Sequence, residues 1–163
     1  MKKKPKISIL VCGGNGFIGY NILNHLTKNN NYNIYATYRH KHKAVKKVNW
    51  IKADLLNNNT VKKVLKNKDI VIQAAAITTG SKDVVKRPYI HVTDNIIMNT
   101  LLLRSAYENY VKHFIFFSCT VMYNSSNSFH SETSKNIIND DSPYFGVGNM
   151  KMFVENQCLF YSK

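Results

Sequence analysis

Residues 7–19, ISILVCGGNGFIG, join a largely apolar run to a glycine-rich turn and then to the start of a helical pattern. A continuous apolar run that ends in glycine is typical of a buried parallel strand. The pattern that follows, over residues 17–28, places apolar side chains at helical spacing, namely Ile18, Ile22, Leu23 and Leu26. The stretch therefore predicts a strand–turn–helix unit that opens a parallel α/β sheet.

Three glycines in this turn, Gly13, Gly16 and Gly19, follow one another at intervals of three. The first permits a tight turn, the second lets the backbone approach a diphosphate, and the third permits close packing of helix on strand. An anion would then lie on the helix N-terminus, where free N–H groups and the helix dipole favour it. A tight turn needs glycine in any case, so bare turn geometry is the alternative. The strand before the turn and the amphipathic helix after it favour a dinucleotide site.

The rest of the chain alternates between strand-like and helix-like segments. Further strands are expected at residues 33–38, 48–51, 69–74 and 113–118, and further helices at 60–65, 93–109 and 149–161. This order predicts βαβ crossovers and hence a Rossmann-type, doubly wound parallel sheet in a three-layer αβα arrangement. Ligands of such sheets lie beyond the carboxyl ends of the strands, so the residues that directly follow each strand are the candidates for a site.

Composition limits the classes of protein to consider. The chain has 163 residues, 44% of them hydrophobic, which suits one sizeable core. No apolar run approaches the roughly 20 residues of a membrane span. The lysine-led N-terminus resembles a signal peptide, but its apolar stretch is short and runs into the glycine turn, so a cytosolic protein is expected.

The net charge of +14 has two interpretations. Lysines cluster within residues 2–4, 41–47 and 62–68 and could attract nucleic acid or anionic ligands. No nucleic-acid motif accompanies them, and the abundance of asparagine indicates a coding bias that would also enrich lysine. A solvated basic surface is therefore expected, with neither nucleic acid nor membrane as a partner.

The cysteines Cys12, Cys119 and Cys158 are odd in number and far apart. This spacing indicates neither a disulfide framework nor a zinc site, and no metal is expected.

Several motifs in order resemble the extended short-chain dehydrogenase/reductase superfamily, also called the NAD-dependent epimerase/dehydratase family. They are GGNGFIG, ADL at 53–55, QAAA at 73–76, DNIIMNTLLL and FFSCTVMY. The segments HVTDN and KMFVENQCLFY are most similar to GDP-L-fucose synthase and its relatives. The resemblance implies a nucleotide-sugar substrate and these cofactor-binding residues: Gly13, Gly16, Phe17, Ile18, Gly19, Asp54, Leu55, Ala74, Ala75, Ala76, Asn95 and Lys151.

The end of the second predicted strand bears on the type of nicotinamide cofactor. An NAD enzyme usually has an acid here for the ribose 2′-hydroxyl, whereas this segment is YATYRHKHK. Arg39 suits a 2′-phosphate, so NADP is predicted, with NAD possible. The alternative is that these are surface residues of a lysine-rich protein.

The resemblance also implies a tyrosine that moves the proton of a sugar hydroxyl, a lysine that lowers the pKa of this tyrosine, and a Ser or Thr partner. The family's Ser/Thr position falls on Cys119, so its neighbours Ser118 and Thr120 are candidates for the hydroxyl role. Cys119 itself is either a reactive thiol or a small buried side chain.

The lysine of this arrangement is expected at Lys151, because KMFVE resembles the family's Lys-x-x-x-Glu. The tyrosine's usual place, four residues earlier, holds Val147, and Tyr144 stands seven residues before Lys151. Tyr144 is therefore the candidate acid/base if residues 144–148 are irregular, which Pro143 and the glycines at 146 and 148 favour. Otherwise Tyr144 only packs or binds substrate.

Family members of this kind are considerably longer and carry a C-terminal substrate domain. Residues 1–163 are therefore expected to form one NAD(P)-binding Rossmann domain of an incomplete family member. The resemblance also implies a homodimer through the last two long helices. The leading interpretation is a nucleotide-sugar epimerase, dehydratase or reductase; its rivals are a non-catalytic dinucleotide-binding module with a sensing or scaffolding role and an RNA-associated protein.

Overall fold

The computed structural model describes residues 5–42, 45–79, 83, 86–123, 129–131 and 141–163. The chain divides into two compact units. The first comprises Met1–Ala76 and Leu101–Phe117, and the second comprises Ile77–Thr100 and Ser118–Lys163.

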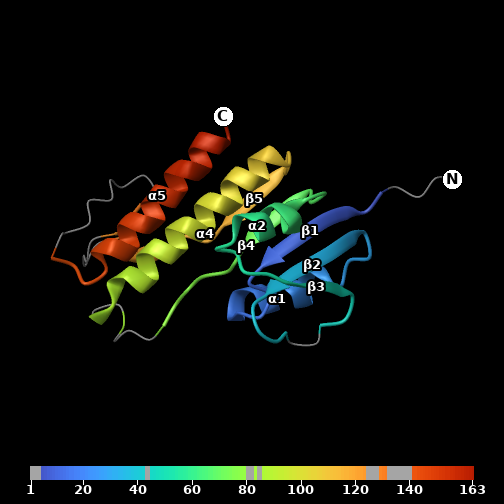
Figure 1. Ribbon diagram of the computed structural model, residues 1–163, viewed down its shortest axis with the longest axis horizontal. Coiled ribbons are helices and arrows are strands. Elements are labelled where there is room, and N and C mark those ends of the chain that lie inside the picture. Colours follow the sequence, from blue (N-terminus) through green and yellow to red (C-terminus); the bar gives the residue numbers. More distant parts are fainter. Residues whose placement is uncertain (1–4, 43–44, 80–82, 84–85, 124–128, 132–140) are drawn as a thin grey trace. The chain divides into compact units, whose positions relative to one another are not determined.

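The first unit is built on a five-stranded parallel sheet in the order β3-β2-β1-β4-β5 (Figure 1). Its strands are β1 (Ile7–Cys12), β2 (Tyr32–Tyr38), β3 (Val48–Lys52), β4 (Ile70–Gln73) and β5 (His113–Phe116). Its helices are α1 (Phe17–Leu26), α2 (Asn58–Leu65) and the last residues of α4 (Pro88–Glu108). The strand order reverses between β1 and β4, which confirms the doubly wound Rossmann-type sheet.

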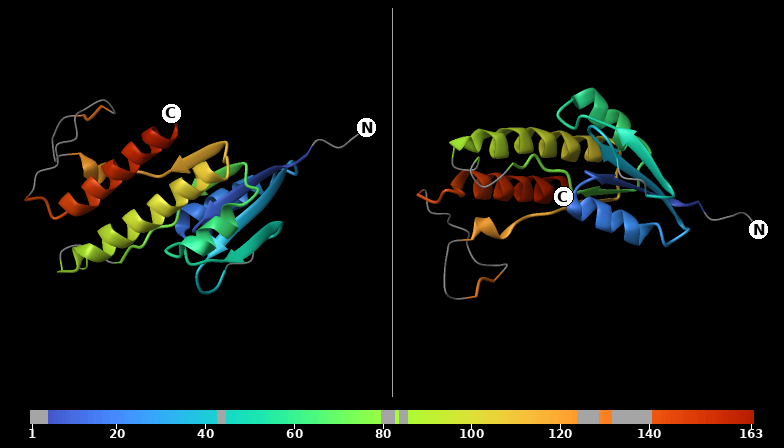
Figure 2. Two further views of the ribbon diagram at one scale, coloured as in Figure 1. Left: turned by 45° about the horizontal axis from the view of Figure 1, so that its top comes forward. Right: turned by 90° about the horizontal axis from the view of Figure 1, so that it is seen from below.

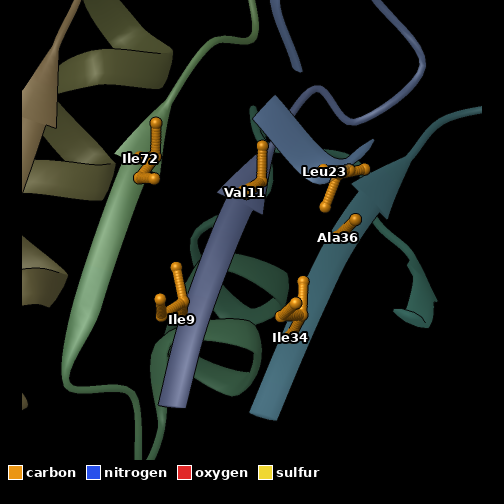
Figure 3. Close-up of a cluster of buried hydrophobic side chains, with 6 residues drawn as sticks. All are labelled: Ile9, Val11, Leu23, Ile34, Ala36 and Ile72. Carbon is orange, nitrogen blue, oxygen red and sulfur yellow. The ribbon is translucent and has the colours of Figure 1, made fainter. Parts of the chain in front are cut away.

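One face of the sheet packs against α1. Leu23 of the helix is fully buried beside Val11 and Ala36, and the cluster also contains Ile9, Ile34 and Ile72 (Figure 3). These strand residues alternate along β1 and β2, because successive side chains of a strand point to opposite faces. The predicted buried strand and amphipathic helix thus form one core.

The other face is covered by α2 and by residues 101–108 of α4 (Figure 2). Val61 and Leu65 of α2 and Leu102 of α4 are fully buried. At the surface, Lys62 of α2 pairs with Glu108 of α4 at 3.9 Å. A pair this exposed contributes little stability, so the apolar burial holds this layer.

In the second unit, helix α5 (Phe145–Tyr161) lies alongside residues 88–100 of α4 (Figure 2). Thr100 Oγ1 donates a hydrogen bond of 3.0 Å to Gln157 Oε1 between the two helices. The short 3-10 helix η1 (Thr120–Met122) packs against α5. Met122, Met150 and Val154 form the buried apolar side of this arrangement.

Helix α5 corrects one expectation. Residues 144–148 are not irregular: the helix starts at Phe145, and Gly148 N–H donates to the carbonyl of Tyr144 at 2.8 Å. The glycines predicted to break the backbone lie inside the helix instead. A Cβ on Gly146 would lie 3.0 Å from Val92 Cγ2 of α4, so the missing side chain lets the two helices approach closely.

Helix α4 also begins earlier than predicted, at Pro88 instead of residue 93. Proline is favoured in the first turn of a helix, because its fixed φ suits the helix and its missing N–H would be unpaired there. Among the described residues, no helix is both long and apolar enough to cross a membrane.

Candidate functional site

The glycine turn after β1 is shaped by its contacts with the neighbouring strands. Gly13 has a φ of +75°, and a Cβ there would lie 2.6 Å from the Cα of Ala75, so glycine is required. The N–H groups of Gly13 and Gly14 both donate to Thr37, at 3.0 Å to its Oγ1 and 3.0 Å to its carbonyl. The predicted role of Gly13 in a tight turn is confirmed.

The other two predicted glycines differ from each other. A Cβ on Gly19 would lie 2.3 Å from the carbonyl oxygen of Gly13, so the fold itself requires glycine there. A Cβ on Gly16 would meet only that same oxygen, at 3.4 Å, which is ordinary contact. The φ of Gly16 is −67°, which any residue adopts. The fold therefore does not require glycine at position 16. A ligand that lies against the backbone would require it.

The N-terminus of α1 is open to an anion. Gly16 is its N-cap and has no side chain to bond the first N–H groups, and the first turn contains no acid. Its first two side chains, Phe17 and Ile18, are exposed to solvent, with 84% of Phe17 accessible. Free N–H groups and the positive end of the helix dipole make this end suited to a phosphate.

The carboxyl ends of β1 and β4 meet at this turn. Cys12 pairs in register with Gln73, which brings Gly13 against the segment containing Ala74, Ala75 and Ala76. The Gln73 side chain brackets Ala75, donating to its carbonyl at 3.1 Å and accepting from its N–H at 3.2 Å. These small residues, which the resemblance assigned to cofactor binding, thus lie after β4 at the topological switch point of the sheet.

The ends of β2 and β3 supply the remaining predicted residues of this unit. Arg39 directly follows β2 and is exposed. Asp54 is exposed beyond β3, where one carboxylate oxygen accepts the N–H of Leu56 at 3.1 Å, while Leu55 is buried. The structure therefore gathers the residues of the first unit along the carboxyl edge of one sheet.

Three residues of this edge escaped the sequence interpretation. Thr37 holds the glycine turn, Gln73 holds Ala75, and Gly14 packs so tightly that a Cβ would lie 2.8 Å from that of Ala36. For these three residues, the only signal in the sequence was the second glycine of the GG pair, Gly14. The partners of Thr37 are far along the chain, which no local pattern shows.

Cys12 lies under the same turn and is fully buried. Burial raises the pKa of its thiol to about 12, although a hydrogen bond with Thr37 opposes this. A thiol with so high a pKa is inert at neutral pH, so Cys12 is a packing residue.

In the second unit, Asn95 holds the segment that follows β4. Its Oδ1 accepts the N–H of Ile77 at 3.0 Å, and its Nδ2 donates to the carbonyls of Ile77 and His91 at 2.9 and 2.8 Å. These contacts give Asn95, which the resemblance places among the cofactor-binding residues, a structural role in holding this segment. Beside it, buried His91 bonds through Nε2 to Thr79 Oγ1 at 2.9 Å, a pair that sequence reasoning missed.

Cys119 and the two candidates for the hydroxyl role, Ser118 and Thr120, lie at the start of η1. Cys119 is its N-cap with an extended backbone, Thr120 is its first residue, and Ser118 precedes it. Ser118 Oγ donates to the sulfur of Met122 at 3.3 Å. A sulfur is a weak acceptor, so this bond leaves the hydroxyl readily available to a better one.

Lys151 lies on α5, which packs against η1, and is half-buried. Burial lowers the pKa of its amine, and the charges of Cys119 and Glu155 partly oppose this. Lys151 thus lies on the helix that packs against η1, at whose start the predicted Ser/Thr position holds Cys119.

Tyr144 is not brought to Lys151 in the same way. It is the N-cap of α5, with 41% of its surface exposed, and the helix is regular from Phe145 onward. Two helical turns separate the backbones of Tyr144 and Lys151 by about 10 Å. Val147 occupies the position one turn before the lysine. Within the described residues, no group of three or more His, Cys, Asp or Glu could hold a metal ion.

Comparisons with known proteins agree with this geometry. Residues 9–163 match the NAD dependent epimerase/dehydratase family. The chain is 33% identical over 138 residues to the bifunctional polymyxin resistance protein ArnA of Wigglesworthia glossinidia brevipalpis, with 80% of this chain and 21% of that protein covered.

Two solved structures have the same fold. One is the UDP-glucuronic acid 4-epimerase of Bacillus cereus in complex with NAD, at 27% identity and a TM-score of 0.75, with 95% of this chain and 52% of that chain covered. The other is the UDP-Glc/GlcNAc 4-epimerase of Campylobacter jejuni, at 21% identity and a TM-score of 0.82, with 96% and 49% covered. The chain spans about half the length of these structures. It belongs to the NAD-dependent epimerase/dehydratase family.

Proposed function

We propose that this chain is the nicotinamide-dinucleotide-binding part of a nucleotide-sugar epimerase, dehydratase or reductase, which acts on a sugar hydroxyl or keto group by hydride and proton transfer. Family membership supports the reaction class. That residues 1–163 form a single NAD(P)-binding Rossmann domain is part of the same proposal.

The observation that supports cofactor binding best is the glycine at position 16. A Cβ at this position would cause no clash within the protein. The space that glycine leaves open there lies directly at the uncapped N-terminus of α1. A diphosphate fits this place, because it needs close approach to the backbone and the positive end of the helix.

For the cofactor, we propose NADP in preference to NAD. The end of β2 has no acid for a ribose 2′-hydroxyl, and exposed Arg39 offers a charge-assisted partner for a 2′-phosphate. The related B. cereus structure contains NAD, so NAD is the competing choice. Titration with NADPH and NADH tests this: Arg39→Ala should weaken NADPH far more than NADH, and equal loss would contradict the NADP assignment.

The residues of the second unit have distinct roles in this proposal. A nicotinamide, when bound, accepts and returns hydride. Lys151 holds the nicotinamide ribose and, as a cation, lowers the pKa of a nearby tyrosine. Thr120 or Ser118 positions the substrate oxygen, and Tyr144 is the candidate that gives or takes its proton.

The substrate is proposed as a nucleotide-sugar. The two epimerase structures described above are named for UDP-sugars. The finer likeness to GDP-L-fucose synthase stays a prediction. Turnover assays with UDP-hexoses and with GDP-4-keto-sugars separate the two.

The regular start of α5 favours a second candidate function, a catalytically impaired dinucleotide-binding module that senses cofactor or scaffolds a partner. Tyr144 lies two turns from Lys151, and Val147 has no ionisable group to replace it. In this case cofactor binding persists and proton transfer is lost.

Two substitutions distinguish the candidates. Loss of turnover in Tyr144→Phe would support the enzyme with Tyr144 as acid/base, whereas undiminished turnover would remove Tyr144 from the mechanism. If the wild type binds cofactor without turnover and Val147→Tyr gains activity, the impaired module is supported. Cofactor titrations on each variant control for damage to the binding site.

We also propose a homodimer through α4 and α5. Several large apolar side chains of α5 are exposed to solvent: Phe145, Phe153, Leu159 and Phe160. Exposed apolar faces of this kind mark association surfaces.

A further inference from the structure

The basic segment that follows β2 is tied to the glycine turn by two separate contacts. The side chain of Asn15, inside the turn, donates a hydrogen bond to the carbonyl of Lys41. The ring of His42 stacks on Trp50 of β3, with ring centroids 4.8 Å apart and an interplanar angle of 17°. The segment is therefore attached at its end and is not held by β2 alone.

Trp50 connects this stack to the turn itself. A Cβ on Gly14 would lie 2.9 Å from Trp50 Cζ3, so the indole packs directly under the turn. Tyr38, the last residue of β2, closes the cluster with its ring 4.9 Å from that of His42 at 62° and 6.2 Å from that of Trp50 at 73°. Edge and stacked ring pairs of this kind contribute beyond the area they bury.

The indole Nε1 of Trp50 is buried, and within the part of the chain described it has no hydrogen-bond partner. Trp50 thus contributes stacking and packing to this place and no polar contact there. The stack with His42 depends on ring overlap, which another aromatic ring would reproduce.

The attached segment bears positive charge on side chains that are exposed to solvent. Arg39, His40 and Lys41 follow one another without an acid between them. A basic segment that is free to move pays an entropic cost when it orders around a phosphate, and one that is already fixed avoids part of that cost.

We propose that His42 and Asn15 are positioning residues that hold segment 39–41 beside the glycine turn to receive a phosphate monoester on the adenosine ribose. The proposal rests on the proposed dinucleotide binding and adds the residues that determine its 2′-phosphate preference. His42 acts through its stack on Trp50, and Asn15 through the Lys41 backbone.

The test uses two probes that differ mainly in the 2′-phosphate, adenosine 2′,5′-bisphosphate and adenosine 5′-monophosphate. Trp50 is the only tryptophan of the chain, so its fluorescence reports on the cluster without interference. The wild type should bind the bisphosphate more tightly. His42→Ala and Asn15→Ala should each reduce this preference by roughly three- to tenfold and leave the affinity for the monophosphate within about twofold.

The conservative variant His42→Phe keeps a stacking ring and should retain the preference. His25→Ala, which removes a histidine from the last turn of α1, is the matched control and should change neither the preference nor the Trp50 emission of the free protein. His42→Ala should change that emission, which separates loss of the stack from general destabilisation.

Each other result overturns the proposal in a distinguishable way. If His42→Phe loses the preference as fully as His42→Ala, the imidazole contacts the phosphate directly and does not act through the stack. If the variants keep the wild-type preference, or if the wild type binds both probes equally, the positioning role is wrong while dinucleotide binding stands. If the wild type binds neither probe nor a nicotinamide dinucleotide, both proposals fail.

Discussion

Gly16 and Gly19 are equivalent in a sequence motif but differ in what surrounds them. The Cβ of any residue at position 19 would lie 2.3 Å from the carbonyl of Gly13, while at position 16 it would lie 3.4 Å from that atom. One glycine is thus required by the fold, and the other is required only by the proposed diphosphate. This difference leads to opposite expectations for two substitutions of similar size.

Gly16→Ser should leave folding intact and weaken dinucleotide binding. Serine is a good N-cap residue, so the melting temperature should stay the same or rise slightly. The added side chain fills the space proposed for the diphosphate, and affinity should fall by roughly tenfold or more, about 1.4 kcal/mol. Calorimetric titration with NADPH measures this.

Gly19→Ala is the matched comparison. It forces a backbone clash and should destabilise the protein by about 1–3 kcal/mol, measured by denaturant unfolding. Equal affinity of Gly16→Ser and wild type for the dinucleotide would contradict the proposed diphosphate site.

Lys151 provides a pH-dependent prediction. Burial lowers the pKa of its amine below 10.5, so between the lowered value and 10.5 the unfolded chain binds more protons than the folded chain. Lys151 should therefore contribute a rise in stability with pH across that window, because the penalty for the buried charge is lifted as the amine deprotonates. The Cys12 thiol, with its pKa raised to about 12, contributes in the opposite direction, so the contribution of Lys151 is obtained by comparison with variants.

The variant Lys151→Met should flatten this rise, and the exposed Lys63→Met should not. Lys68, whose pKa burial also lowers, contributes to the same window, so Lys68→Met should flatten part of it. Urea unfolding at a series of alkaline pH values measures the slopes. A slope that is unchanged in Lys151→Met would show that the amine is solvated in the folded protein.

At the scale of elements, strands and their order followed from the sequence more closely than helix starts did. Strand β1 was located at Ile7–Cys12 because its last four residues, which are buried, are all apolar. The start of α5 was placed four residues too late, because glycines at 146 and 148 were interpreted as backbone breakers. Tertiary packing against Val92 explains Gly146, and local propensity does not.

The candidate site likewise contains some residues that the sequence indicated and others that it did not. Gly13 was predicted because it follows a predicted strand, where a parallel sheet gathers its ligand-binding residues, and Asp54 was predicted because ADL resembles the family's motif. Thr37 was missed because its partner Gly13 is set by the register between β1 and β2. Gln73 was missed because its bonds to Ala75 depend on the path of the backbone directly after β4. The place of Tyr144 could not be settled from sequence, since it depends on whether α5 is regular before Lys151.

Gly146 allows a test of the α4–α5 contact as an element. Alanine favours a helix over glycine by about 1 kcal/mol, but here its Cβ would lie 3.0 Å from Val92 Cγ2. The two effects should nearly cancel, so Gly146→Ala alone should change the free energy of unfolding by less than about 1 kcal/mol.

Val92→Ala removes the crowded methyl groups. In that background Gly146→Ala should stabilise by about 1 kcal/mol, and a double-mutant cycle on denaturant unfolding measures the coupling. Strict additivity of the two substitutions would show that the helices do not meet at this point.

At the scale of the whole molecule, net charge and apolar exposure act against each other in the proposed dimer. Each copy has a formal net charge of +14, so two copies repel one another. Phe153 and Phe160 are exposed and seven residues apart, which places them on one face of α5. For a dimer to form, the free energy gained by burying this face would have to exceed the electrostatic repulsion between the two copies.

The dimer should therefore strengthen as salt rises, because screening weakens the repulsion and leaves the apolar contact in place. Binding to a polyanion such as RNA should show the opposite trend and weaken steeply with salt. Sedimentation equilibrium at a series of salt concentrations distinguishes these two behaviours of the same basic chain.

Replacing both Phe153 and Phe160 by Glu should dissociate the dimer. This double substitution lowers the net charge of each copy by two, which on its own reduces repulsion and favours association. Dissociation would therefore be due to the lost apolar surface and not to charge. Phe129→Glu removes an exposed phenylalanine outside α4 and α5 and should leave the dimer intact. A monomeric wild type at every salt concentration, or a dimer that survives the double substitution, would show that this face of α5 is not the interface.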